Sequence, residues 1–181
     1  IGVGLLYQAT GTLNIADLAV RVPELTENRS VRAAFAFMTV GIGIKLALFP
    51  LHIWLPNAYA YAPSVSSAFL AATATKVSIY VLMRVFYTIF GPAFSFETLP
   101  LDWVLLPLAI IAMFVGSTVA IFQVDMKRML AYSSVAQIGY MVVGISLVSV
   151  LGMTGGLLHL FNHALMKGAL FLAMGCIFYR I

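Results

Sequence analysis

The chain has 181 residues, of which 62% are hydrophobic and only 9% are charged. A soluble domain carries about a quarter charged residues, so this chain has too few polar side chains to cover a water-facing surface. The composition therefore predicts an integral membrane protein and excludes a soluble enzyme, a disordered chain and a nucleic-acid-binding protein. The net charge of +4 is spread along the sequence and forms no basic stripe.

Cofactor motifs are missing from the sequence. The single cysteine, Cys176, excludes a disulfide framework and a cysteine-ligated cluster within this chain, and no glycine-rich nucleotide motif is found. We expect no cofactor here, and any redox chemistry of a parent complex would belong to other subunits.

In chain order, the first 30 residues precede the long apolar segments. Residues 1–10 are typical of the end of a preceding helix, and residues 11–30 predict an interfacial loop. Within this loop, residues 13–21 have the pattern of a short amphipathic helix that Pro23 ends. Because the chain begins at Ile1 and ends inside an apolar run, residues 1–181 are interpreted as a single fragment of a larger transmembrane domain.

Five apolar segments are long enough to cross a bilayer core, which takes about 20 helical residues. They lie at about 31–55, 64–90, 103–123, 128–148 and 153–179. The predicted fold class is therefore all-α, a polytopic transmembrane helix bundle. Pro50 lies inside the first segment and predicts a discontinuous helix, because proline removes a backbone donor and clashes with the preceding turn. Residues 90–100 predict a loop.

Three lysines lie where a membrane protein rarely carries charge. Lys45, Lys76 and Lys167 are each about 12 to 14 residues inside an apolar segment, which is ~18–21 Å along a helix and near the membrane midplane. Each would cost about 3 kcal/mol if it faced lipid, so we expect all three to face the bundle interior. A buried ammonium is destabilised relative to the neutral amine, and a group that exchanges its proton is what a proton relay requires.

The last segment adds a titratable row. His159, His163 and Lys167 follow each other at steps of four residues, so they line one stripe of a helix. This pattern predicts a proton relay, although single membrane histidines more often join helices. Two histidines at this spacing also resemble zinc ligands, but no carboxylate lies nearby in the sequence, so we expect no metal. Lys45 and His52 are seven residues apart and are expected to share a face on either side of Pro50.

Three ordered blocks of sequence resemble a known family, the antiporter-like membrane subunits of respiratory complex I, Mrp-type sodium/proton antiporters and membrane-bound hydrogenases. The blocks are Lys45–Tyr59 with Ala62–Ser67 and Lys76, Asp125–Tyr140, and His159–Lys167. The resemblance implies that Lys45 is the key lysine of a broken helix, that Lys76 is the connecting lysine, and that the histidine stripe joins two half-channels. His52 and Pro50 are expected to have supporting roles, because they lie beside Lys45 at the break.

The predicted function is that of a proton-translocating subunit in a multisubunit complex of a bacterial or archaeal cell membrane, with H⁺ as cargo and Na⁺ left open. Asn57 and Tyr59 favour the Mrp D-type over a complex I-like NADH:quinone oxidoreductase, in which Asp-Ala-His is frequent at this place. Two alternatives stay open from the residues alone. Midplane ammonium groups could serve a carrier for an anionic solute, or the lysines could be inert pairs in a structural subunit.

Overall fold

The computed structural model describes residues 1–180, and all of its elements are helical. The first half contains α1 (Gly2–Thr10), α2 (Ile15–Arg21), η1 (Val22–Leu25), α3 (Arg29–Leu46) and α4 (Trp54–Tyr61). The second half contains α5 (Ser64–Arg84), η2 (Val85–Ile89), η3 (Ala93–Thr98), α6 (Asp102–Ile121), α7 (Met126–Ser146) and α8 (Val150–Arg180). The predicted all-α helix bundle is confirmed.

Four helices in the described part of the chain are long and apolar enough to cross a membrane. They are Ser64–Ile89, Asp102–Ile121, Met126–Ser146 and Val150–Tyr179. The remaining predicted segment, 31–55, is divided into α3 and α4 by the non-helical residues 47–53. The predicted loop at 90–100 differs from the structure, because η3 forms one π-helical turn there.

The break after α3 begins at Ala47, three residues before Pro50. A helical Pro50 could not donate to the carbonyl of Leu46, and its ring would press on that carbonyl, so a regular helix cannot continue through Pro50, and α3 ends before it, at Leu46. Ala47 then takes a left-handed conformation with φ 63°, and Leu48 N–H donates to Gly43 O at 2.8 Å. The indole N–H of Trp54 donates to Ile44 O at 2.8 Å, and the same carbonyl accepts from Ala47 N–H at 3.0 Å, so a residue of α4 adds a hydrogen bond to the last turn of α3.

Side-chain caps explain where other helices begin. The Asn28 side chain accepts from Ser30 N–H at 2.8 Å and starts α3, and Asn14 caps α2 in the same way. The Asp125 carboxylate accepts from Lys127 N–H at 2.8 Å and starts α7 directly after the turn that follows α6. The amphipathic segment 13–21 forms α2 as far as Arg21, and Pro23 lies in the 3₁₀ turn η1 that follows it.

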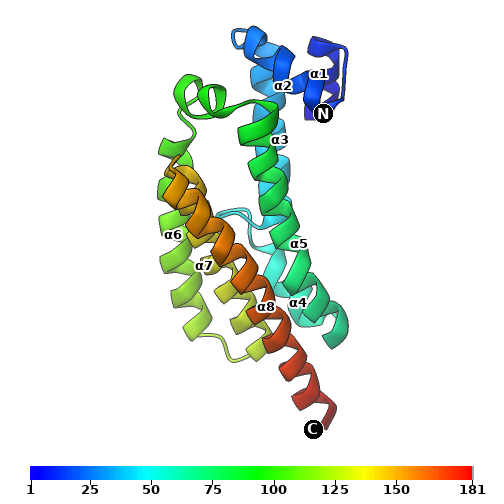
Figure 1. Ribbon diagram of the computed structural model, residues 1–181. Helices are drawn as coiled ribbons and strands as arrows, with labels where there is room; N and C mark the ends of the chain where they lie inside the picture. The colour runs from blue at the N-terminus through cyan, green and yellow to red at the C-terminus, as the bar shows by residue number, and fades with distance from the viewer. Residues whose placement is uncertain (181) are drawn as a thin grey trace.

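Helix α8 crosses the bundle obliquely and packs against both α5 and α7 (Figure 1). Helix α7 in turn packs closely against α6 and contacts α4. Small residues allow these close approaches, and a Cβ placed on Gly144 of α7 would lie 2.6 Å from Gly152 O of α8. The helices that carry the candidate site, α5 and α8, are therefore held against one another and against α7.

Candidate functional site

Lys167 lies on the buried face of α8, where its side chain is only 4% exposed. Its ammonium donates to Leu130 O at 2.8 Å and to the Ser133 hydroxyl, and both partners belong to α7. These partners are neutral, so the lysine is bound in the bundle interior without a carboxylate. Lys167 therefore faces the interior of the bundle.

His163 and His159 lie above one another on the same face of α8. Their ring centroids are 6.1 Å apart and their planes differ by only 7°. His163 is 1% exposed, and neither of its ring nitrogens has a hydrogen-bond partner within residues 1–180. The His159 ring lies 5.9 Å from that of Tyr140 on α7. Buried polar atoms without partners are rare in folded proteins, and this stripe places unpaired ring nitrogens in an apolar part of the bundle.

Lys76 lies on α5, on the face that packs against α8, and its side chain is 5% exposed. The ammonium donates to Ala71 O of its own helix. Lys76 and Lys167 lie within electrostatic range of each other, and both lie within electrostatic range of His163. The structure thus gathers Lys76, His163 and Lys167 from two helices into one buried group.

At the break between α3 and α4 the expectation that Lys45 faces the bundle interior and shares a face with His52 is wrong. Lys45 lies in the last turn of α3 and is exposed, whereas His52 is buried beyond the end of that helix. A spacing of seven residues puts two side chains on one face only along a continuous helix, and α3 ends between them. His52 stacks on Phe49 at 5.2 Å and meets the edge of Tyr132 of α7 at 6.3 Å.

Acidic side chains lie away from this group. Within residues 1–180 the one ion pair joins Arg32 to Glu27 at 2.9 Å, close to the start of α3. The described residues contain no group of three or more histidine, cysteine or acidic side chains that could hold a metal ion. The buried lysines are therefore surrounded by apolar side chains, backbone carbonyls, a hydroxyl and imidazole rings.

Ser133 and the Leu130 carbonyl were not among the residues predicted from the sequence to contact Lys167. A signal was present, because Ser133 belongs to the Asp125–Tyr140 block and is a polar residue in an apolar helix. Nothing in the sequence, however, says which neighbouring helix faces Lys167. The partner becomes visible only when α7 and α8 are packed together.

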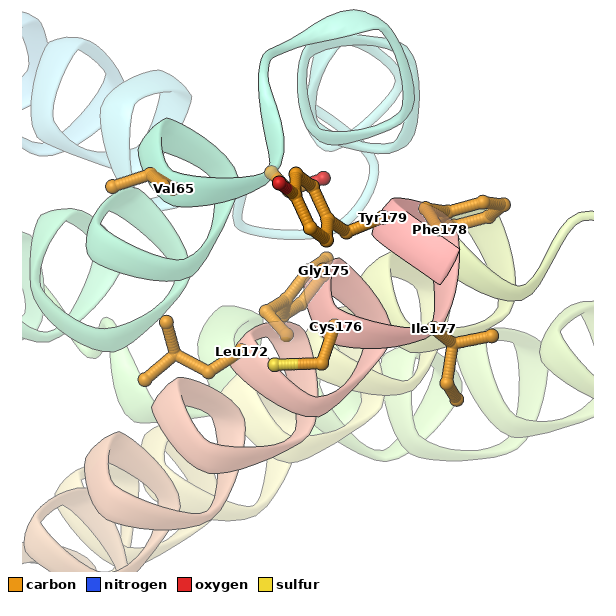
Figure 2. A pocket seen from close by; sticks show the side chains of 9 residues that line it. Val65, Leu172, Gly175, Cys176, Ile177, Phe178 and Tyr179 are labelled. Atoms are coloured by element: carbon orange, nitrogen blue, oxygen red, sulfur yellow. The ribbon is translucent and has the colours of Figure 1, made fainter. Parts of the chain in front are cut away.

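A separate groove of about 1000 Å³ opens between the start of α5 and the end of α8. Figure 2 shows Val65 on one side of it and Leu172, Gly175 and Cys176 on the other. The lining is mostly apolar, and none of the predicted site residues contributes to it. The titratable group is thus distinct from this groove.

Residues 1–181 match the family model described as "NADH:quinone oxidoreductase/Mrp antiporter, TM". The chain is 50% identical over 178 residues to NADH-quinone oxidoreductase subunit N of Desulforudis audaxviator, covering 97% of this chain and 34% of that protein. It is 40% identical over 177 residues to the D-type subunit of the Na⁺/H⁺ antiporter of Alkalihalophilus pseudofirmus, covering 97% and 35%. The chain therefore spans about a third of the length of these relatives.

Solved structures show the same arrangement of helices. A chain of the Mrp complex from Dietzia sp. DQ12-45-1b superposes with a TM-score of 0.86 at 34% identity, with 97% of this chain and 32% of that chain covered. A chain of the membrane-bound sulfane sulfur reductase, an archaeal respiratory membrane complex, gives a TM-score of 0.86 at 32% identity, with 97% and 35% covered. The chain is an integral membrane protein that belongs to the NADH:quinone oxidoreductase/Mrp antiporter transmembrane family.

Proposed function

We propose that this chain forms part of a proton-translocating membrane subunit and that Lys76, His163 and Lys167 carry the proton through it. The observation that supports the proposal is the burial of two lysines and a histidine in one group without an acidic partner among the described residues. An ammonium buried without a counter-ion is costly, and releasing its proton removes that cost. A group of this kind can take up and release protons as its surroundings change.

Imidazole suits a position beside the two lysines. A neutral histidine ring has one nitrogen that donates and one that accepts, so it can receive a proton on one side and release it on the other. The 6.1 Å separation of the parallel His159 and His163 rings is too long for a direct hydrogen bond, so transfer along the stripe requires a bridging water molecule. We propose that His159 extends the route along α8.

Lys45 and His52 are proposed to serve the same route from the break between α3 and α4. His52 touches Tyr132 of α7, and the next residue of α7, Ser133, binds Lys167. The break and the buried group are thus joined through one turn of α7. Pro50 contributes by keeping this segment out of the helical conformation.

The relatives indicate the setting in which such a subunit acts. One is named as the N-type subunit of an NADH-quinone oxidoreductase and the other as the D-type subunit of a Na⁺/H⁺ antiporter. We propose that this chain likewise works with other membrane subunits in a complex of the Mrp type or the complex I type, and that electron transfer, where it occurs, takes place in other subunits. The proton route is the part that this chain's own residues supply.

The test is proton transport by the full-length subunit, assembled in its complex and reconstituted in vesicles. We expect Lys76→Ala and Lys167→Ala each to lower the rate at least tenfold while the amount of assembled complex is unchanged, because each removes a group that carries the proton. The matched control is Arg84→Ala, which removes an exposed cation from the last turn of α5 and should keep the rate.

Normal transport in both lysine variants would refute the proposed route. Loss of the assembled complex without a specific transport defect would instead favour a structural role for the lysines. Substrate-dependent flux of an anion through the wild-type protein, with no proton movement, would favour the carrier interpretation.

A further inference from the structure

The two α7 partners of Lys167 differ in their chemistry. The ammonium donates to Leu130 O at 2.8 Å and also to the Ser133 hydroxyl. A backbone carbonyl can only accept a hydrogen bond, whereas a hydroxyl can accept and donate. Ser133 can therefore accept from the N–H groups of Lys167 and can also donate to the lone pair that the neutral amine carries, whereas Leu130 O can only accept from the N–H groups.

The Ser133 hydroxyl is already oriented for this task. It donates its own proton to Leu130 O at 2.9 Å, so its lone pairs are available to the N–H groups of Lys167. If Lys167 loses a proton, its nitrogen gains a lone pair and the hydroxyl can rotate to donate to it. Leu130 O then keeps the backbone hydrogen bond that α-helical geometry provides.

Lys167 has neighbours that are positively charged when protonated, so a neutral hydrogen-bonding partner such as Ser133 can hold its nitrogen without repelling it. Lys76 faces it from α5 and His163 from its own helix, and each repels Lys167 when protonated. No described acidic side chain faces the group, and α7 contributes neutral partners to it. A neutral amine keeps two N–H groups that can donate to Leu130 O, but its lone pair needs a donor, and the Ser133 hydroxyl of α7 lies at the nitrogen to supply one.

We propose that Ser133 is a positioning residue that holds the Lys167 nitrogen at one place in both of its protonation states. The proposal rests on the proposed function, since it assumes that Lys167 exchanges a proton. Ser133 itself neither stores nor transfers the proton; it keeps the acceptor where the proton arrives. The hydroxyl is therefore the required feature of the side chain, and its size is secondary.

The experiment compares Ser133→Ala and Ser133→Thr in the full-length subunit within its complex, with proton transport in vesicles as the readout. Ser133→Ala should lower the rate about tenfold, the effect of losing one hydrogen bond to a charged group. Ser133→Thr should keep most of the rate, because a helical threonine hydroxyl can bond the carbonyl three or four residues earlier, as Ser133 does.

A packing role predicts the opposite order, since alanine is smaller than serine and threonine adds a methyl group. The matched control is Ser146→Ala, which removes a buried hydroxyl from the other end of α7, where it donates to Val142 O at 2.8 Å. This control should transport protons at the wild-type rate.

Three results would overturn the proposal: a wild-type rate in Ser133→Ala, a lower rate in Ser133→Thr than in Ser133→Ala, or an equal loss in Ser146→Ala. If Ser133→Ala does not assemble, the rate of Ser133→Thr decides, with a full rate in support and a low rate against. Normal rates in both Lys76→Ala and Lys167→Ala would refute the proton route itself. An inactive Lys167→Ala beside a fully active Ser133→Ala would refute only the role of Ser133.

Discussion

The contact between α7 and α8 gives a sharp test of how closely the helices pack. Gly144 of α7 faces Gly152 and Gly156 of α8, and the three residues carry no side chain between the two backbones. We consider Gly144→Ala. The new Cβ would lie 2.6 Å from Gly152 O and 3.2 Å from the Cα of Gly156.

The magnitude follows from these distances. An ordinary van der Waals contact begins at 3.4 Å, so the Gly152 carbonyl would have to move by about 0.8 Å, the difference between 3.4 and 2.6 Å. The obstructing atoms are backbone atoms of a helix and cannot rotate away. Overpacking of this kind costs about 1–3 kcal/mol, and the better helix propensity of alanine returns up to about 1 kcal/mol. We expect a net loss of about 1–2 kcal/mol of stability.

The assay is the thermal unfolding of the purified full-length protein in detergent, compared with Gly155→Ala. Gly155 lies in α8, and a Cβ there would meet nothing within 4 Å. This control therefore gains the better helix propensity of alanine without any steric cost. Gly144→Ala should unfold at a lower temperature than wild type and Gly155→Ala at an equal or higher one. Equal unfolding temperatures for the two variants would refute the close approach of α7 and α8.

Substitutions at three further sites test local features by the same unfolding measurement. Asp125→Ala removes the side chain that accepts from two backbone N–H groups in the first turn of α7 and should cost about 1 kcal/mol, whereas Asp125→Ser should retain most of the stability. Trp54→Phe leaves the Ile44 carbonyl without its indole donor and should cost about 1 kcal/mol; an unchanged unfolding temperature would contradict this bond. Tyr132→Phe keeps the ring against His52 and should be neutral, while Tyr132→Ala should destabilise the protein.

Periodicity and composition were sufficient for the helices, because a chain in a membrane must satisfy its backbone within each segment. They were less informative at the break. Pro50 indicates an interruption, but the helix already ends at Leu46, and the left-handed residue that follows is Ala47, which has no preference for that conformation. The interruption therefore depends on Pro50, three residues after Ala47, and on packing around it, and the residue type at Ala47 does not indicate it.

The positions of some titratable residues could be predicted from the sequence, and those of others could not. The steps of four between His159, His163 and Lys167 fix their common face once the segment is helical, so the stripe could be predicted. The seven-residue step from Lys45 to His52 could not be used, because it crosses the end of α3. Which residues of a neighbouring helix contact the stripe depends on where the helices cross, and the sequence does not give that position.

Helix α7 shows why the neutral part of the site matters as much as the charged part. Its membrane-spanning segment is the most buried of the four candidate spans, and it touches the break through Tyr132, Lys167 through Ser133 and His159 through Tyr140. Each charged group on a neighbouring helix needs a polar neighbour that does not repel it, and a helix with charges of its own at these positions could not supply one for all of them. For Lys167 the Leu130 carbonyl and the Ser133 hydroxyl of α7 meet that requirement, and the rings of Tyr132 and Tyr140 on the same helix pack against His52 and His159.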